Sequence, residues 1–168
     1  MDSDIAAMTD INDLDLSTVE TDFPLLASGI AVVQVQSCAL QPADDKKQGS
    51  FPYLEIKFAL TQPHQTAAGE GRTVKTINPG DRGSSVNHRI YYGVSYKKKE
   101  EGTKFGYDAI AKFREAVFGK ATAGTKFSCD EMLGQQLSVR LLFEAHPQRD
   151  GTEYGPRTTV ADFIRKAR

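Results

Sequence analysis

The alternation of apolar and polar positions predicts β-strands along most of this chain. It is clearest at residues 53–61, where the apolar side chains from Leu54 to Leu60 alternate with polar or small ones. A period of two puts one face of a strand on the core and the other in water. Similar runs predict strands at 30–40, 72–77, 135–145 and 158–164. The run 90–96 fits either an additional strand or an irregular flap.

One segment has helical spacing instead. Ile110, Phe113 and Val117 recur at intervals of three and four residues, which predicts an amphipathic helix over 108–119. Asp108 is suited to cap its first turn and Gly119 to end it in a left-handed conformation. Further along, 129–134 is typical of one helical turn and a stop, and the Asp-Gly pair at 150–151 predicts a tight hairpin turn.

Three strands, a helix and two strands are the element order of an OB-fold, a small Greek-key barrel that often binds single-stranded nucleic acid or oligosaccharide. We therefore predict a mainly β protein with an OB-fold-like Greek-key barrel (β-β-β-α-β-β), one main helix and an extended, acidic N-terminal arm. The arm comprises residues 1–22, and a single nucleic-acid-binding domain comprises 23–168. A length of 168 residues suits one such domain.

Charge is segregated along the sequence, although the net charge is only −1. Residues 1–45 hold no lysine or arginine but nine acids: Asp2, Asp4, Asp10, Asp13, Asp15, Glu20, Asp22, Asp44 and Asp45. The rest of the chain holds all 21 bases and the other 13 acids, a net charge of +8. A basic body attracts phosphates, and an acidic arm can compete for the same surface. The alternative is that the arm is only a solvated lead-in.

No arrangement of residues points to catalysis. The three histidines have no cysteine or carboxylate at metal-ligand spacing, and Cys38 and Cys129 lack a CxxC partner, so each is expected to be a small buried apolar residue. We therefore expect no enzyme activity, no metal and no cofactor. The N-terminus carries aspartates where a secretory signal carries bases. This favours a cytoplasmic location.

Cations interleaved with aromatic rings are the strongest functional signal. Exposed rings stack on unpaired bases, and lysines and arginines neutralise phosphates. One candidate surface lies in a single span: Arg89, Tyr91, Tyr92, Tyr96, Lys97, Lys98, Lys99, Lys104, Phe105 and Tyr107. A second follows from the usual OB ligand path across strands two and three and two flanking loops: Lys46, Lys47, Tyr53, Lys57, Arg72, Lys75, Arg149, Tyr154 and Arg157. The alternative is that the rings cover the barrel and the lysine run is a solvated loop.

Several short segments share their order and spacing with one class of proteins. They are LSTVE at 16–20, FPLLASG at 23–29, YLEIKF at 53–58, GR at 71–72 and GTEYG at 151–155. Over residues 16–164 they resemble phage-encoded single-stranded DNA-binding proteins. The resemblance implies an OB core and sequence-independent coating of single strands during phage DNA replication or recombination in the host-cell cytoplasm. It also implies replication or recombination proteins as partners, and homo-oligomers are common among single-strand binders.

A function of a different class fits the same composition. A phage structural or host-interaction protein would use the β-barrel as a scaffold and present its basic surface to an acidic protein partner. The chain also ends in Arg165-Lys-Ala-Arg168, whereas many single-strand binders end in an acidic tail. The acidic arm is a possible substitute for that tail.

The arm yields a first testable prediction. If its acids compete with phosphates for the basic body, removing residues 1–15 is expected to tighten DNA binding. A binding titration of the truncated chain beside the full chain measures the difference. Equal affinities would contradict the competition.

Overall fold

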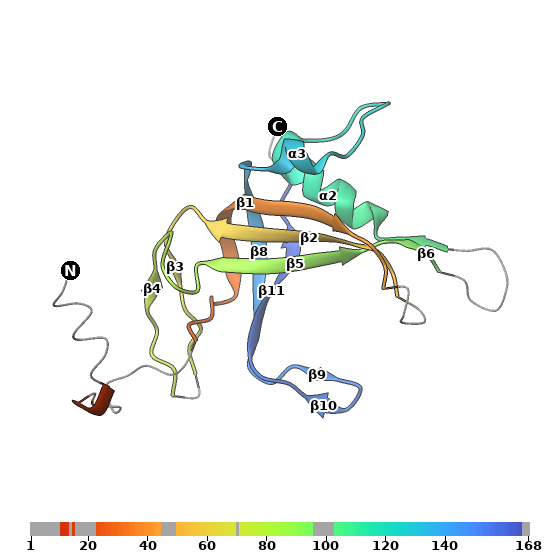
Figure 1. Cartoon of the computed structure of the whole chain (residues 1–168). Coiled ribbons are helices and arrows are strands. Elements are labelled where there is room, and N and C mark those ends of the chain that lie inside the picture. The colour runs from red at the N-terminus through yellow and green to blue at the C-terminus, as the bar shows by residue number, and fades with distance from the viewer. Residues whose placement is uncertain are drawn as a thin grey trace.

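The structure is a computed structural model that describes residues 11–13, 15, 23–44, 50–69, 71–95 and 103–165. Its centre is an antiparallel sheet of five strands in the order β11-β8-β1-β2-β5 (Figure 1). The five strands are β1 (Gly29–Gln41), β2 (Tyr53–Leu60), β5 (Ser85–Tyr91), β8 (Gln136–Glu144) and β11 (Arg157–Phe163). The prediction of a mainly β protein is therefore confirmed.

Short ribbons and helices make up the other elements. The paired ribbon strands are β3 (His64–Gln65) with β4 (Thr76–Ile77), β6 (Gly93–Ser95) with β7 (Thr103–Phe105), and β9 (Gln148–Arg149) with β10 (Thr152–Glu153). The helices are η1 (Ile11–Asp13), a 3-10 turn, α2 (Tyr107–Phe118) and α3 (Cys129–Met132). Figure 1 shows β3–β4 and β6 at opposite ends of β2 and β5, and β9–β10 below them. Within the described part of the chain, no helix has the length and apolar composition needed to cross a membrane.

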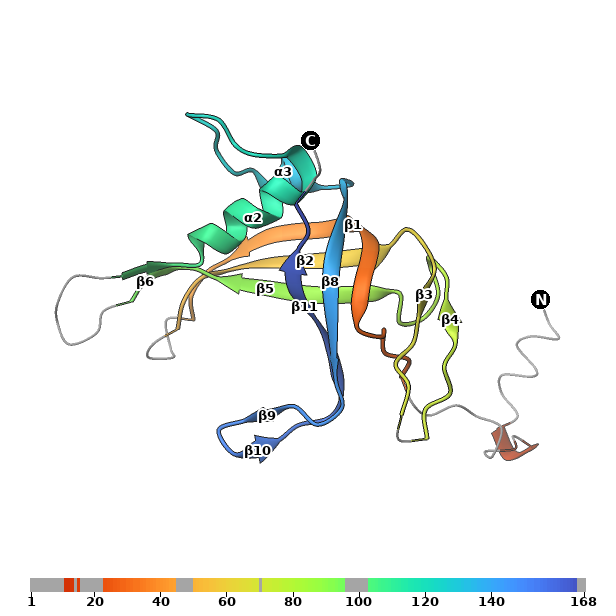
Figure 2. The ribbon, with the colours of Figure 1, turned by 180° about the vertical axis from the view of Figure 1, so that it is seen from behind.

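Strand β1 joins the two halves of the sheet. Its first half, from Gly29 to Gln34, pairs with β8, and its second half, from Val33 to Gln41, pairs with β2. The register of the β1–β2 ladder shifts between Val35 and Ser37, and such a bulge bends a strand and increases its twist. The bend lets β8 and β11 cross β2 and β5 at a steep angle. Figure 2, seen from behind, shows β8 and β11 in front of β2 and β5.

The expected barrel closure is not confirmed. Among the described residues the sheet is open, and β5 and β11 are its edge strands. The two edges nevertheless lie in contact with each other.

Helix α2 covers one end of the core with Phe113. Its ring is fully buried, 5.8 Å from the Phe58 ring and 5.3 Å from the Phe163 ring, measured between centroids. Val117 is buried and Ile110 is partly buried against the core, as the helical spacing predicted, and Ala116 is buried as well. One aromatic side chain thus connects α2 with β2 and β11.

The start of α2 differs from the prediction. The helix begins at Tyr107 with Gly106 as its N-cap residue, and the cap has no side-chain hydrogen bond, so the prediction that Asp108 caps the helix is wrong. Gly106 has φ 80°, and a Cβ there would lie 2.1 Å from the Tyr91 carbonyl oxygen. Only glycine fits this close approach. At the other end, Gly119 is the C-cap residue, so the predicted helix end is confirmed. Its φ of 80° and ψ of −175° are not the left-handed helical conformation that the sequence predicted.

The predicted third strand is also wrong in part. Of residues 72–77 only the last two form a strand, and this strand, β4, pairs with β3 outside the main sheet. The third strand of the main sheet is β5, which the 90–96 run overlaps by two residues. His88 lies on the inner side of β5 between the buried Val86 and Ile90. This histidine interrupts the apolar alternation that would have identified the strand.

The other predicted elements are confirmed. Strands β1, β2, β8 and β11 agree with the predicted ranges to within one residue at each end. Asp150 and Gly151 have φ 54° and 78°, as a two-residue hairpin turn requires. The single turn at 129–132 is helix α3.

His88 gives the fold a pH dependence. Burial lowers the pKa of His88 below its ordinary 6.5, so the unfolded chain binds this proton more readily than the folded chain. The free energy of unfolding should therefore fall as pH drops through about 6.5. Urea unfolding at about pH 7.5 and about pH 5.5 measures the change. Replacing His88 with leucine should reduce the pH dependence, and an unchanged dependence in H88L would contradict this account.

Candidate nucleic-acid interface

The exposed sides of β2 and β5 form one surface of facing side chains. The inward residues Leu54, Ile56 and Phe58 are fully buried, so the alternate residues of β2 point away from the core. Cross-strand register pairs Tyr53 with Tyr91, Glu55 with Arg89 and Lys57 with Asn87. We call these six residues the β2–β5 outer face.

Three of them form what we call the Tyr–Arg cluster: Tyr53, Arg89 and Tyr91. The two tyrosine rings lie 5.2 Å apart between centroids, tilted by 46°. The Arg89 guanidinium carbon lies 4.8 Å from the Tyr53 ring centroid, and the neighbouring Tyr91 side chain raises the pKa of Arg89. Tyr91 remains 47% exposed. The cluster thus offers aromatic surface and positive charge at one solvent-facing place.

Glu55 forms an ion pair with Arg89. Its Oε2 lies 3.9 Å from Arg89 Nε, and both side chains are substantially exposed. An exposed pair of this length contributes little to stability. Its effect is to orient the guanidinium and to offset part of its charge.

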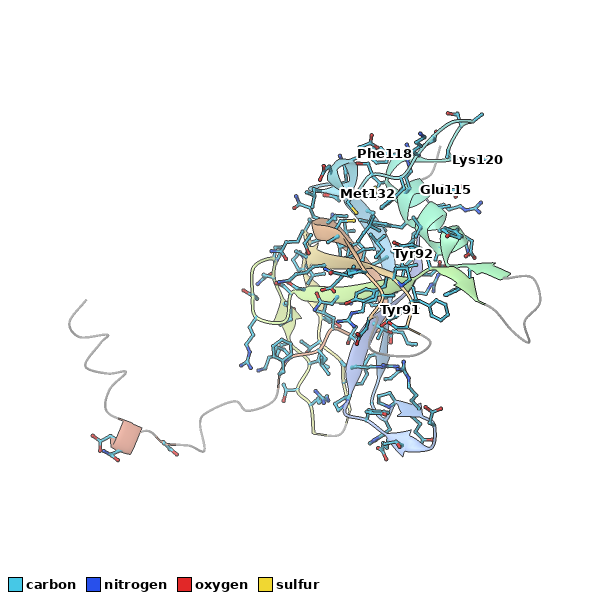
Figure 3. All side chains as sticks on the ribbon, turned by 45° about the vertical axis from the view of Figure 1, so that its right-hand side comes forward. Tyr91, Tyr92, Glu115, Phe118, Lys120 and Met132 are labelled. Atoms are coloured by element: carbon cyan, nitrogen blue, oxygen red, sulfur yellow. The ribbon has the colours of Figure 1, made fainter. Side chains whose placement is uncertain are left out.

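A second ring pair lies near the same end of β5. Tyr92 follows β5 and Tyr107 begins α2, and their ring centroids are 6.0 Å apart. Tyr107 is exposed and Tyr92 is half-buried. Figure 3 shows Tyr91 and Tyr92 together at the end of β5, well separated from Phe118 and Lys120 at the other end of α2. The close approach at Gly106 fixes the start of α2 against this end of β5.

Phe105 has a structural contact instead. Its half-buried ring meets Phe51 edge-on at 4.8 Å. The contact fastens the β6–β7 ribbon to the segment that leads into β2.

The remaining described candidates lie on other elements. Arg72 and Lys75 belong to the segment between β3 and β4, at the opposite end of the sheet from β6 (Figure 1). The Arg72 guanidinium carbon lies 5.6 Å from the Phe143 ring centroid. Arg149 and Tyr154 lie on and just after the β9–β10 ribbon, and both are exposed. The structure thus separates these residues from the Tyr–Arg cluster.

Arg157 and several loop residues complete the set of candidates. Arg157, at the start of β11, has its Nη2 3.7 Å from Glu144 Oε1. Lys104 belongs to β7, but its side chain is not described. Further candidates lie outside the described residues: Lys46, Lys47, Tyr96, Lys97, Lys98 and Lys99.

The structure also brings the two cysteines together, which their spacing in the sequence did not indicate. Cys38 on β1 and Cys129 on α3 are both half-buried free thiols that neighbour each other. Burial raises the pKa of Cys38 far above its ordinary value, and the contact with Cys129 raises it further.

Cys38 should be unreactive in the folded chain. A thiol with a raised pKa carries little thiolate at neutral pH, and the thiolate is the nucleophile. We expect iodoacetamide to alkylate Cys38 much more slowly in the native protein than in urea, and mass spectrometry of the labelled peptide measures both rates. Equal rates in the two states would contradict the burial of this thiol.

No known protein-family profile matches the chain, and no curated protein matches it in sequence. The chemistry of the β2–β5 outer face must therefore be judged from its own side chains. These provide ring faces, cations and hydrogen-bond donors. Among the described residues, no three His, Cys, Asp or Glu side chains gather as a metal site would need.

Proposed function

We propose that this chain binds single-stranded DNA without sequence preference on the β2–β5 outer face, as a binding protein and not as an enzyme. The observation that carries the proposal is the Tyr–Arg cluster, in which two tyrosine rings and a guanidinium share an exposed sheet surface. Rings on such a surface can stack on bases, and every base has a flat face. Sequence-independent binding follows from that chemistry.

Charge near the cluster supports the same function. Lys57 is exposed on the same face, and two lysine groups occupy the connections on either side in the sequence, Lys46 and Lys47 between β1 and β2, and Lys97 to Lys99 between β6 and β7. Lysines release counterions from phosphates when a strand binds. The proposed affinity therefore depends on salt.

The topology favours an OB-fold-like barrel for this role. The five strands of the main sheet, with α2 between β5 and β8 in sequence, follow the element order of that fold, and the contact between β5 and β11 lies where its barrel closes. OB ligands cross the second and third strands, which are β2 and β5 here. The resemblance of the sequence motifs adds the proposed setting, phage DNA replication or recombination in the host-cell cytoplasm with replication or recombination proteins as partners.

A fluorescence titration of labelled oligo-dT at two salt concentrations tests the proposal. We expect binding at low salt that weakens as salt rises, and weaker binding to a duplex of the same length. Absence of binding at low salt, or binding indifferent to salt, would contradict the proposal. Capture of a protein partner that survives nuclease treatment would instead favour a structural or host-interaction role.

A further inference from the structure

Arg89 is held in place by three neighbours. Its guanidinium lies over the Tyr53 ring at 4.8 Å, neighbours the Tyr91 side chain and pairs with Glu55 at 3.9 Å. Even so, 54% of the Arg89 side chain is exposed. The cation is thus fixed in orientation without being covered.

This arrangement is poorly suited to simple neutralisation of phosphate. Glu55 already offsets part of the charge of Arg89, and a cation that only meets phosphates needs no fixed plane. The guanidinium is flat, however, and a flat cation lying over one ring can present its other face to a second planar group. Nucleic-acid bases stack on guanidinium planes as well as on aromatic rings.

We infer that Arg89 is a stacking surface for one unpaired base, so that the plane of the guanidinium is what the strand contacts. This inference rests on the proposed function and makes it more specific: Arg89 would select unpaired bases over duplex, because the bases of a duplex have no free faces along the helix. Lysine keeps the charge but lacks the plane.

The test compares the wild-type chain with R89K. We expect R89K to bind oligo-dT about fivefold or more weakly, with an unchanged slope of affinity against salt because the charge is conserved. On a strand of the same length with abasic sites in place of the bases, the two proteins should bind equally. On duplex DNA they should also bind equally.

R82K is the matched control. The Arg82 guanidinium carbon lies 5.0 Å from the Phe23 ring centroid, so this arginine lies over a ring at a similar distance but outside the β2–β5 outer face. We expect R82K to bind oligo-dT like the wild type, and thermal unfolding checks that both variants remain folded.

The outcomes separate the two hypotheses. Wild-type affinity in R89K, or an equal loss on oligo-dT and on the abasic strand, would overturn the stacking role of Arg89 and leave the proposed function standing. Failure of the wild-type chain to bind oligo-dT would overturn both.

Discussion

Replacing Tyr53 and Tyr91 together with alanine is expected to weaken oligo-dT binding by about 5- to 150-fold, because stacking on aromatic side chains contributes about 1–3 kcal/mol per base. The two rings face each other across β2 and β5 at 5.2 Å, so we treat them as one platform. Fluorescence titration at a single salt concentration measures the loss. The slope of affinity against salt should remain, since no charge is removed.

Phe118→Ala is the control for this double substitution. Phe118 is 41% exposed, and it lies at the end of α2 away from Tyr91 (Figure 3). Removing it should leave DNA binding unchanged. If Y53A/Y91A binds like the wild type, or if F118A loses as much affinity, the β2–β5 outer face is not the binding surface.

Phe113→Ala is expected to cost about 3–5 kcal/mol of folding free energy, the usual range for a large aromatic residue in a well-packed core. The Phe113 ring is fully buried and contacts the rings of Phe58, Phe127 and Phe163. Alanine would leave a cavity where α2 meets the sheet. Chemical denaturation, followed by circular dichroism, measures the change.

F118A serves here as well, because it removes the same kind of side chain from an exposed position of the same helix. Its cost should stay near the few tenths of a kcal/mol typical of exposed substitutions. A loss below about 1 kcal/mol in F113A would show that this core tolerates the cavity, contrary to its packing.

The sequence predicted most of the main sheet because local pattern determines those strands. β2 and β8 have apolar residues at every second position, and only the end of β8 departs from this, with Leu142 exposed and Phe143 half-buried. β5 escaped detection because His88 takes an inward position that is usually apolar. The 72–77 run has strand-like residues, but only Thr76 and Ile77 pair with another strand. That strand is β3, which lies nearby in the sequence and outside the main sheet. Which strand pairs with which depends on the tertiary structure, and the periodicity of one segment does not predict it.

The sequence predicted which residue types form the candidate site, but not how they are arranged. Tyr53 and Tyr91 were both named, but in two separate surfaces, since only the register of β2 against β5 brings them together. The orientation of Arg89 depends on three side chains from two strands, which no linear pattern encodes. Arg72 and Arg149 were expected to lie on the same ligand path as Tyr53. They lie instead on the β3–β4 and β9–β10 ribbons, away from the Tyr–Arg cluster.

The double pairing of β1 has a consequence for how the chain is made. Gly29 to Gln34 are among the first described residues to leave the ribosome, but their ladder partners on β8 lie at 136–141. Until that late segment is synthesised, the backbone edge of β1 at Ala31 and Val33 has no β8 strand to pair with. Contacts between distant parts of a chain form slowly, and unpaired strand edges invite association with other chains. The nascent protein is therefore most exposed to aggregation just before β8 is complete.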